Sequence, residues 1–136
     1  MVGILVVTHR RLAEELIATA ELIVGKIDGC VGLSLDPDLP VDDLRRQIDE
    51  AMAEVNDGDG VIVLTDMFGG TPSNLSLSFL NQERVEVVTG VNLPMLLKLA
   101  HSREEPRVDE LARLIKDHGR RSISLASEIL DQEVEK

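Results

Sequence analysis

Residues 1–9 read MVGILVVTH, and this stretch decides the fold. From Met1 to Val7 the side chains are apolar and mostly β-branched, which is typical of a parallel strand covered on both faces. The chain then continues from Arg10 to Val24 with the spacing of an amphipathic helix. A buried strand followed at once by a helix is the unit from which parallel α/β sheets are built.

The same order of strand and helix recurs along the rest of the chain. The residue pattern predicts strands at 2–7, 31–35, 61–65 and 85–89, and helices at 10–24, 41–55, 72–80, 92–100 and 107–118. The first helix is expected to bury Leu12, Leu16, Ile17, Ala20 and Ile23. We therefore expect an α/β fold of three layers, with a mainly four-stranded parallel sheet and helices on both faces.

The C-terminal segment fits two structures. Residues 122–130 alternate like a strand at Ile123 and Leu125, but they also fit the continuation of a helix. As a strand, the segment can pair at an edge of the sheet, including the edge of a second subunit. The acidic end, Glu128 to Lys136, is expected to be solvated.

Size and composition indicate one globular domain, which we expect to span 1–136. Of the 136 residues, 43% are hydrophobic and 29% are charged, and no apolar run approaches the ~20 residues that cross a bilayer. The first residues lack the basic region and cleavage site of a secretory signal, and Cys30 is the only cysteine. These features lead us to expect a cytoplasmic protein.

The formal net charge of −11 at pH 7 narrows the range of partners. It disfavours nucleic acid and anionic membrane surfaces, whose phosphates repel an acidic protein. It favours a basic protein partner because opposite charges speed encounter, although simple solubility explains the same charge. No spacing of His, Cys, Asp and Glu matches a zinc or calcium site, so we expect neither a metal nor another cofactor.

His9 is the first candidate functional residue. It follows a buried strand and precedes a helix, where open α/β sheets hold ligands and unpaired helical N–H groups attract anions. An imidazole is in part neutral near pH 7 and can act as a nucleophile. A phosphoryl group on the ring would meet N–H groups at the start of the helix and gain charge-assisted hydrogen bonds. The alternative is an ordinary polar loop residue.

A second candidate segment follows the strand 61–65 and reads DMFGGTPSN at 66–74. Asp66 can hold one ring nitrogen of His9 and leave the other free to react, or it can cap the next turn. Gly69 and Gly70 allow a tight turn or a close backbone approach, and Thr71 brings a hydroxyl to the next helix. No Gly-Lys-Ser/Thr follows, so the segment is not a Walker loop.

Three blocks of sequence together resemble one known family. They are GILVVTH at 3–9 with the following Leu12-Ala13, TDMFGGTPSN at 65–74 and TGVNLPML at 89–96. In this order they are similar to the mannose-family enzyme IIA of the bacterial phosphoenolpyruvate-dependent sugar phosphotransferase system, over essentially the whole chain. The resemblance implies a four-stranded parallel sheet, often completed by a C-terminal strand exchanged in a homodimer. Residues 119–136 would then be a dimerisation arm or a tail.

The resemblance also implies roles for individual residues. His9 matches the histidine that receives a phosphoryl group from the phosphocarrier HPr and passes it to a IIB protein for sugar uptake and phosphorylation. A membrane permease would be served only indirectly. Asp66 matches the aspartate that orients the histidine, and Thr71 matches a hydroxyl near the phosphoryl group. Asn92 and Pro94 match the third block, whose loop would border the site.

Arg10 and Arg11 depart from the family pattern, which usually has glycine directly after the histidine. Their guanidinium groups can stabilise a phosphoryl group, but they would repel the basic docking face expected of HPr. The catalytic pair is predicted to be His9 and Asp66. The predicted phosphoryl-binding residues are Arg10, Gly69, Gly70, Thr71 and Asn92.

Two other functions stay open. One is a regulatory module that binds a partner protein according to the phosphorylation state of His9, and the other is phosphoryl supply to a dihydroxyacetone kinase. Histidine phosphatases and mutases also place a nucleophilic histidine after their first strand. They need an Arg-His-Gly motif, which Thr8-His9-Arg10 does not match.

Overall fold

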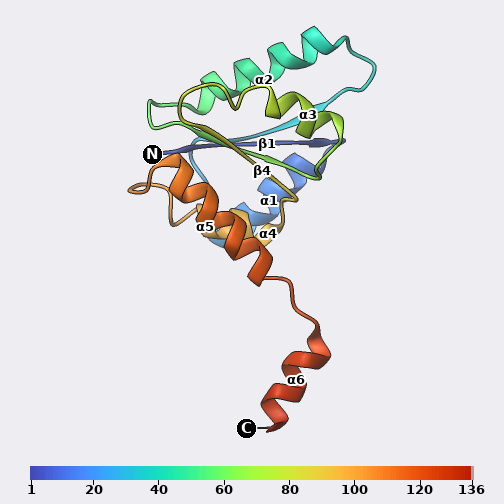
Figure 1. Ribbon diagram of the computed structural model, residues 1–136, viewed down its shortest axis with the longest axis vertical. Coiled ribbons are helices and arrows are strands. Elements are labelled where there is room, and N and C mark those ends of the chain that lie inside the picture. The colour runs from blue at the N-terminus through green and yellow to red at the C-terminus, as the bar shows by residue number, and fades with distance from the viewer. Residues whose placement is uncertain (136) are drawn as a thin grey trace.

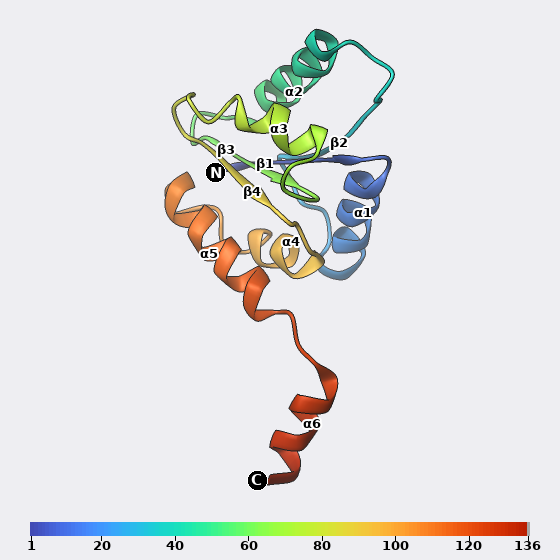
Figure 2. The ribbon, with the colours of Figure 1, turned by 45° about the vertical axis from the view of Figure 1, so that its right-hand side comes forward.

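The computed structural model describes residues 1–135, with side chains to residue 132, as three layers and a separate C-terminal helix (Figure 1). The middle layer is a sheet of four parallel strands in the order β2-β1-β3-β4, namely β1 (Gly3–His9), β2 (Cys30–Leu35), β3 (Val61–Thr65) and β4 (Val85–Thr89). Figure 2 shows α2 (Val41–Val55) and α3 (Thr71–Leu77) on one face of the sheet, and α1 (Leu12–Val24), α4 (Leu93–Leu99) and α5 (Val108–Arg121) on the other. The predicted fold class is confirmed.

The two central strands are apolar over residues 3–7 and 61–64 because both of their faces are buried. Leu5 and Val63 belong to the apolar cluster on the α2–α3 face, and Ile4 and Ile62 belong to the cluster under α1, α4 and α5. All four side chains are fully buried. Successive strand residues point to opposite faces of a sheet, so a strand between two helical layers needs apolar residues at every position.

The strand order reverses between β1 and β3, which lie side by side. In their register Val7 pairs with Thr65, so the carboxyl ends of both strands lie at the same edge of the sheet. Loops that leave such neighbouring strand ends diverge to opposite faces, and ligands of open α/β sheets bind in the crevice between them. The fold therefore brings His9 and the segment after Thr65 to one place.

Several predicted elements differ from the structure at their ends. β1 runs on to His9, and α1 begins only at Leu12, because Arg10 has a left-handed φ of 48° that no helix accommodates. The expected burial of Leu12 and Ile23 is wrong, since they are 45% and 58% exposed.

The buried stripe of α1 consists of Ala13, Ile17 and Ala20. Small residues let this helix approach β2 closely, because a Cβ on Gly32 would lie 3.1 Å from the backbone nitrogen of Glu14. A larger apolar stripe at Leu12 and Ile23 would have needed more room between the helix and the sheet.

The C-terminal segment is helical, which is one of the two structures that its sequence allowed. α6 (Ala126–Glu135) follows α5 and projects away from the three layers (Figure 1). Its apolar side chains Ile129 and Leu130 are 44% and 59% exposed. The part of the chain described here contains no strand after β4, and strand exchange in a dimer stays a prediction. No helix in residues 1–135 is long and apolar enough to cross a membrane.

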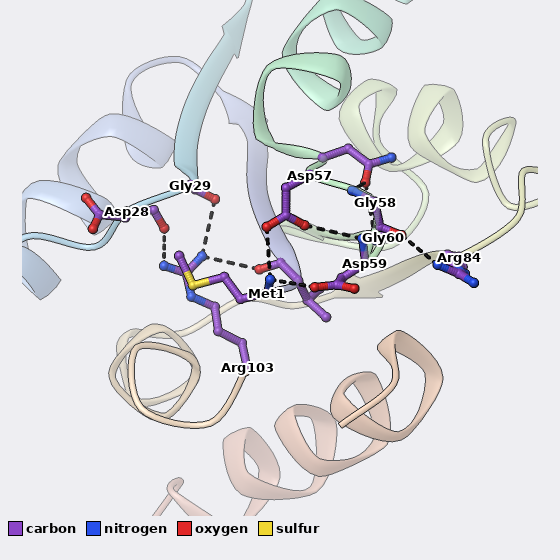
Figure 3. A network of polar contacts seen from close by, with 11 residues as sticks. Met1, Asp28, Gly29, Asp57, Gly58, Asp59, Gly60, Arg84 and Arg103 are labelled. Atoms are coloured by element: carbon purple, nitrogen blue, oxygen red, sulfur yellow. Dashed lines mark hydrogen bonds and ion pairs between the residues drawn. The ribbon is translucent and has the colours of Figure 1, made fainter. Parts of the chain in front are cut away.

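A network of polar contacts links the segments at the amino ends of the strands (Figure 3). The guanidinium of Arg103, which is 4% exposed, donates to the carbonyl oxygens of Val2, Asp28 and Gly29. Nearby, Arg84 donates to the carbonyl of Gly58 at 2.6 Å. The ends of the strands that face away from His9 are thus tied together by the chain itself.

Candidate functional site

His9 and Asp66 meet where β1 and β3 end. His9 is the last residue of β1, and Asp66 follows β3 directly. The Nδ1 atom of His9 lies 2.8 Å from Oδ2 of Asp66, and the same oxygen accepts the backbone N–H of His9 at 3.0 Å. A carboxylate only accepts hydrogen bonds, so in the neutral ring Nδ1 carries the proton and Nε2 keeps its lone pair. The predicted pair is therefore present, with Nε2 as the nitrogen free to react.

The carboxylate of Asp66 is held on both oxygens. Its Oδ1 atom accepts the backbone N–H of Met67 at 3.1 Å, and Oδ2 takes the two hydrogen bonds from His9. Burial alone would raise the pKa of Asp66, but the hydrogen bonds from the ring and backbone of His9 outweigh it and lower the pKa. Asp66 thus stays charged, and it fixes the orientation of the imidazole.

The two side chains differ sharply in exposure. The side chain of His9 is 50% exposed, whereas that of Asp66 is 13% exposed. The orienting group is shielded while the reactive ring faces solvent, which suits a histidine that exchanges a group with another macromolecule.

Gly70 forms the wall beside the reactive nitrogen. A Cβ built on Gly70 would lie 2.7 Å from Cε1 and 3.2 Å from Nε2 of His9, too close for an alanine to fit without movement of the ring. Gly69 makes the turn that brings Gly70 there, with a left-handed φ of 90° that favours glycine. The two adjacent glycines therefore have separate tasks, a turn and a close approach.

A threonine hydroxyl fixes the turn between β1 and α1. Thr8 is fully buried, and its Oγ1 accepts the backbone N–H of Ala13 at 2.8 Å. This bond satisfies one of the N–H groups that the start of α1 leaves unpaired, since the side chain of Arg11 caps nothing. The turn also holds Arg10 in its left-handed conformation beside His9.

A hollow of about 360 Å³ adjoins the histidine. Its lining is mainly apolar and consists of His9, Arg10, Arg11, Ser34, Leu35, Asp36, Pro37, Leu44, Thr71 and Pro72. The hollow joins the β1–α1 turn, the end of β2 and the start of α3, three segments that are far apart in the sequence. It is the space that a group bound to His9, or a partner side chain beside it, would enter.

Several of the predicted site residues lie around the hollow, whereas the side chain of Asn92 is bonded elsewhere. His9, Arg10 and Thr71 line the hollow, and Gly70 lies against the ring. Asn92 instead caps α4: its side chain accepts the N–H of Met95 at 3.2 Å and donates to the carbonyl of Gly119 at 3.0 Å. The contacts of this amide thus lie with α4 and α5 rather than with His9.

The third sequence block, residues 89–96, is hydrogen-bonded to the residue that precedes Asp66. The carbonyl oxygen of Thr65 accepts the backbone N–H groups of both Gly90 and Val91 at 2.9 Å. These bonds anchor the loop after β4 to the residue that precedes Asp66. The block therefore acts on the backbone that carries the carboxylate.

Sequence reasoning missed three features of this site. They are the hydroxyl of Thr8 on α1, the left-handed backbone of Arg10 and the apolar floor around Leu35 and Leu44. A threonine shortly before a helix is a signal of capping, so the role of Thr8 was open to prediction. The apolar floor could not be predicted from the sequence, because only the folded chain brings β2 and α2 beside His9. Among the side chains of residues 1–132, no three His, Cys, Asp or Glu gather in a way that could hold a metal ion.

Comparison with known proteins agrees with the geometry. Residues 3–116 match the family described as PTS system fructose IIA component. The chain is 32% identical over 124 residues to the PTS system mannose-specific EIIAB component of Escherichia coli (strain K12), an alignment that covers 90% of this chain and 38% of that protein. It is 26% identical over 133 residues to the PTS system fructose-specific EIIA component of Bacillus subtilis (strain 168), covering 97% of this chain and 91% of that protein.

A solved structure shows the same likeness. The PTS IIA protein associated with the fucose utilization operon from Streptococcus pneumoniae superimposes with a TM-score of 0.81 and 34% sequence identity. The superposition covers 94% of this chain and 95% of that one.

Proposed function

The chain belongs to the mannose-type enzyme IIA family of the bacterial sugar phosphotransferase system, and from this premise we propose that it carries a phosphoryl group on Nε2 of His9. The observation that supports this proposal most strongly is the His9–Asp66 pair at the strand ends, 2.8 Å apart, with the ring half-exposed. The pair leaves one nitrogen with a free lone pair at a surface that a partner can reach.

The proposed transfer needs only an in-line exchange between two nitrogen atoms. The lone pair of Nε2 attacks phosphorus on the phosphohistidine of the donor, and an Nε2–P bond forms while the donor's N–P bond breaks. The donor nitrogen keeps the electron pair of the broken bond. The ring of His9 gains positive charge in this step, and the carboxylate of Asp66 beside Nδ1–H balances it. Passing the group onward is the same step in reverse.

The phosphoryl oxygens would lie between the ring and the segment that starts α3. We propose that backbone N–H groups at Gly69 and Gly70 and the hydroxyl of Thr71 bind them, because Gly70 adjoins Nε2 and Thr71 lines the same hollow. Asn92 is outside this set because both ends of its amide are engaged elsewhere. A carrier must release the group as readily as it accepts it, so a moderate number of contacts suits the task.

The partners follow from the family. We propose HPr as the phosphoryl donor and a IIB protein as the acceptor, with sugar uptake by a membrane permease served only through the IIB protein. The relative from Escherichia coli is named an EIIAB component, and the chain spans 38% of its length.

The direct test is phosphorylation in a reconstituted relay. The protein is incubated with phosphoenolpyruvate, enzyme I and HPr, and its intact mass is measured. Wild type is expected to gain about 80 Da in an acid-labile form, one phosphoryl group on nitrogen, and His9→Ala is expected to gain nothing. His101→Ala, which changes an exposed histidine at the other end of the sheet, is the matched control and should be phosphorylated like wild type.

Two outcomes would contradict the proposal. If wild type gains no mass from a donor that phosphorylates another IIA protein, the carrier proposal is wrong. Phosphorylation of the His9→Ala variant would instead place the group on a different residue and contradict the assignment of the site.

A further inference from the structure

Arg10 has a backbone conformation that favours glycine. Its φ is 48°, and among residues 1–135 the only other non-glycine residue with a positive φ is Arg84. A Cβ is disfavoured in this region because it approaches the carbonyl oxygen of its own residue. The position directly after His9 would therefore be filled by glycine if the backbone alone decided, and this chain places an arginine there.

The two left-handed arginines use their side chains differently. The guanidinium of Arg84 donates to the carbonyl of Gly58 at 2.6 Å, so its side chain contributes to the fold. The guanidinium of Arg10 makes no hydrogen bond or ion pair with any residue of the described chain, and Arg10 is exposed. The strained backbone at Arg10 therefore holds a cation that the folded chain itself does not use. A conformation of this kind beside a reactive group points to a function of the side chain.

The surroundings of Arg10 suit the binding of an anion. Arg10 lines the same hollow as His9 and Thr71, and the floor of that hollow is apolar. The neighbouring Arg11 lies 3.7 Å from Glu14, so part of its charge is balanced. Among the lining residues Arg10 is thus the cation without a counter-ion in the described chain, beside a wall of low polarity that strengthens interactions between charges.

We propose that Arg10 is a built-in counter-charge that binds the phosphoryl group on Nε2 of His9 and shifts phosphoryl exchange toward this chain. The proposal rests on the proposed function and specifies how its site differs from one with glycine after the histidine. A guanidinium pairs with two phosphate oxygens at once, and this partner exists only in the phosphorylated protein. Interactions made in one state alone move the equilibrium toward that state.

The equilibrium constant and the rate of phosphoryl exchange distinguish binding of the phosphoryl group by Arg10 from an effect of Arg10 on docking of the donor. A cation at Arg10 would also repel a basic donor, which slows the exchange in both directions. Repulsion during encounter leaves the equilibrium constant unchanged, because that constant depends only on the free and phosphorylated end states. The decisive quantity is therefore the equilibrium between phosphorylated HPr and this protein.

The experiment mixes isolated phosphorylated HPr with the protein, in the absence of enzyme I, and measures both phosphorylated species at equilibrium by intact mass. Arg10→Gly is expected to lower the exchange constant about tenfold, in line with the loss of a charge-assisted hydrogen bond. Arg10→Lys keeps the charge and should retain most of the constant. Arg113→Ala, which removes an exposed cation on α5, is the matched control and should stay near wild type.

Two further readouts exclude a merely structural effect. Arg10→Gly relieves the left-handed backbone, so its melting temperature should equal or exceed that of wild type, and a lower constant cannot result from unfolding. Added salt should lower the constant of wild type more than that of Arg10→Gly, because it screens the charge pair.

An unchanged exchange constant in Arg10→Gly, with or without a faster approach to equilibrium, overturns the role of Arg10 alone. An absence of phosphorylation in wild type overturns the proposed function, and the role of Arg10 with it.

Discussion

The polar groups at the two ends of the parallel sheet differ in whether they find hydrogen-bond partners within the chain. At the amino ends, the buried guanidinium of Arg103 donates to three backbone carbonyls, and Arg84 donates to a fourth. At the carboxyl ends, the oxygens of Asp66 are equally well satisfied, but Nε2 of His9 and the guanidinium of Arg10 have no partner within the described chain. The carbonyl groups at the amino ends are thus bonded within the chain, whereas selected atoms at the carboxyl ends are available for chemistry.

Glycines show the same difference between the two ends. A Cβ on Gly60, at the amino end of β3, would lie 2.4 Å from the carbonyl oxygen of Arg84. A Cβ on Gly70, beyond the other end of the strand, would strike the ring of His9. The first glycine permits backbone to pack on backbone, and the second permits a reactive ring to rest against the chain. Alanine at Gly60 should therefore lower stability, and alanine at Gly70 should slow phosphoryl transfer.

The largest effect is expected from Arg103→Ala. Three carbonyl oxygens lose this donor, and of these Gly29 keeps the N–H of Ile4. Because leaving buried polar groups unsatisfied is costly, we expect the free energy of unfolding to fall by about 3 kcal/mol. Urea denaturation followed by circular dichroism measures this change. Arg107→Ala, at an exposed arginine nearby, should have no measurable effect on stability.

The folded fraction of Arg103→Ala should still accept a phosphoryl group at the wild-type rate. A slower rate with unchanged stability would show that the two ends of the sheet are not separate in function.

The next largest effect is expected from Asp66→Asn. An asparagine can still accept one hydrogen bond, but it no longer fixes the tautomer of His9 or balances the charge of the ring. We expect the rate of phosphoryl acceptance to fall by roughly 10- to 100-fold, the range found when a group that orients a metal-binding histidine is changed. Quenched-flow samples analysed by intact mass measure this rate. A wild-type rate in the variant would mean that Asp66 only supports the loop.

Alanine at Gly70 should slow phosphoryl transfer, whereas alanine at the adjacent Gly69 should lower stability. Gly70→Ala displaces the ring of His9, so the transfer rate should fall several-fold to about tenfold with little loss of stability. Gly69→Ala meets no atom within 4 Å but strains a left-handed backbone, so it should lower the free energy of unfolding by about 1 kcal/mol. Loss of transfer in Gly69→Ala alone would reverse the two assigned tasks.

The smallest effect is expected in the dependence of stability on acid. Because the pKa of Asp66 is lower in the folded than in the unfolded chain, its contribution is complete above the ordinary aspartate pKa of 3.8. The contribution is lost as pH falls through the lower folded value. Wild type should thus lose more stability than Asp66→Asn between pH 5 and pH 2, measured as urea midpoints. Parallel curves for the two proteins would contradict the assigned pKa shift.

The sequence predicted the sheet and the reactive pair because both leave a local pattern. Residues 61–64 are apolar at every position and are followed by the buried Thr65, as a strand buried on both faces requires, and the predicted bounds match β3. His9 and Asp66 each stand at the end of such a run, and they meet because β1 and β3 are neighbours in the parallel sheet.

The hollow and the exact start of α1 had no such pattern. They depend on contacts between β2, α2 and Arg10 that form only in the folded chain. Asn92 shows the reverse case: the family resemblance implied a place beside the phosphoryl group, whereas its side chain hydrogen-bonds to Met95 of α4 and Gly119 of α5.

The most direct test of the central claim is to locate the phosphoryl group on the ring. The protein is labelled with ¹⁵N-histidine and phosphorylated, and the coupling between phosphorus and the ring nitrogens is measured by NMR. Phosphorus bonded to Nε2 of His9, with the proton on Nδ1 held by Asp66, is the predicted result. Phosphorus on Nδ1 would require the contact with Asp66 to break, and it would contradict the claim that this contact prepares the histidine for transfer.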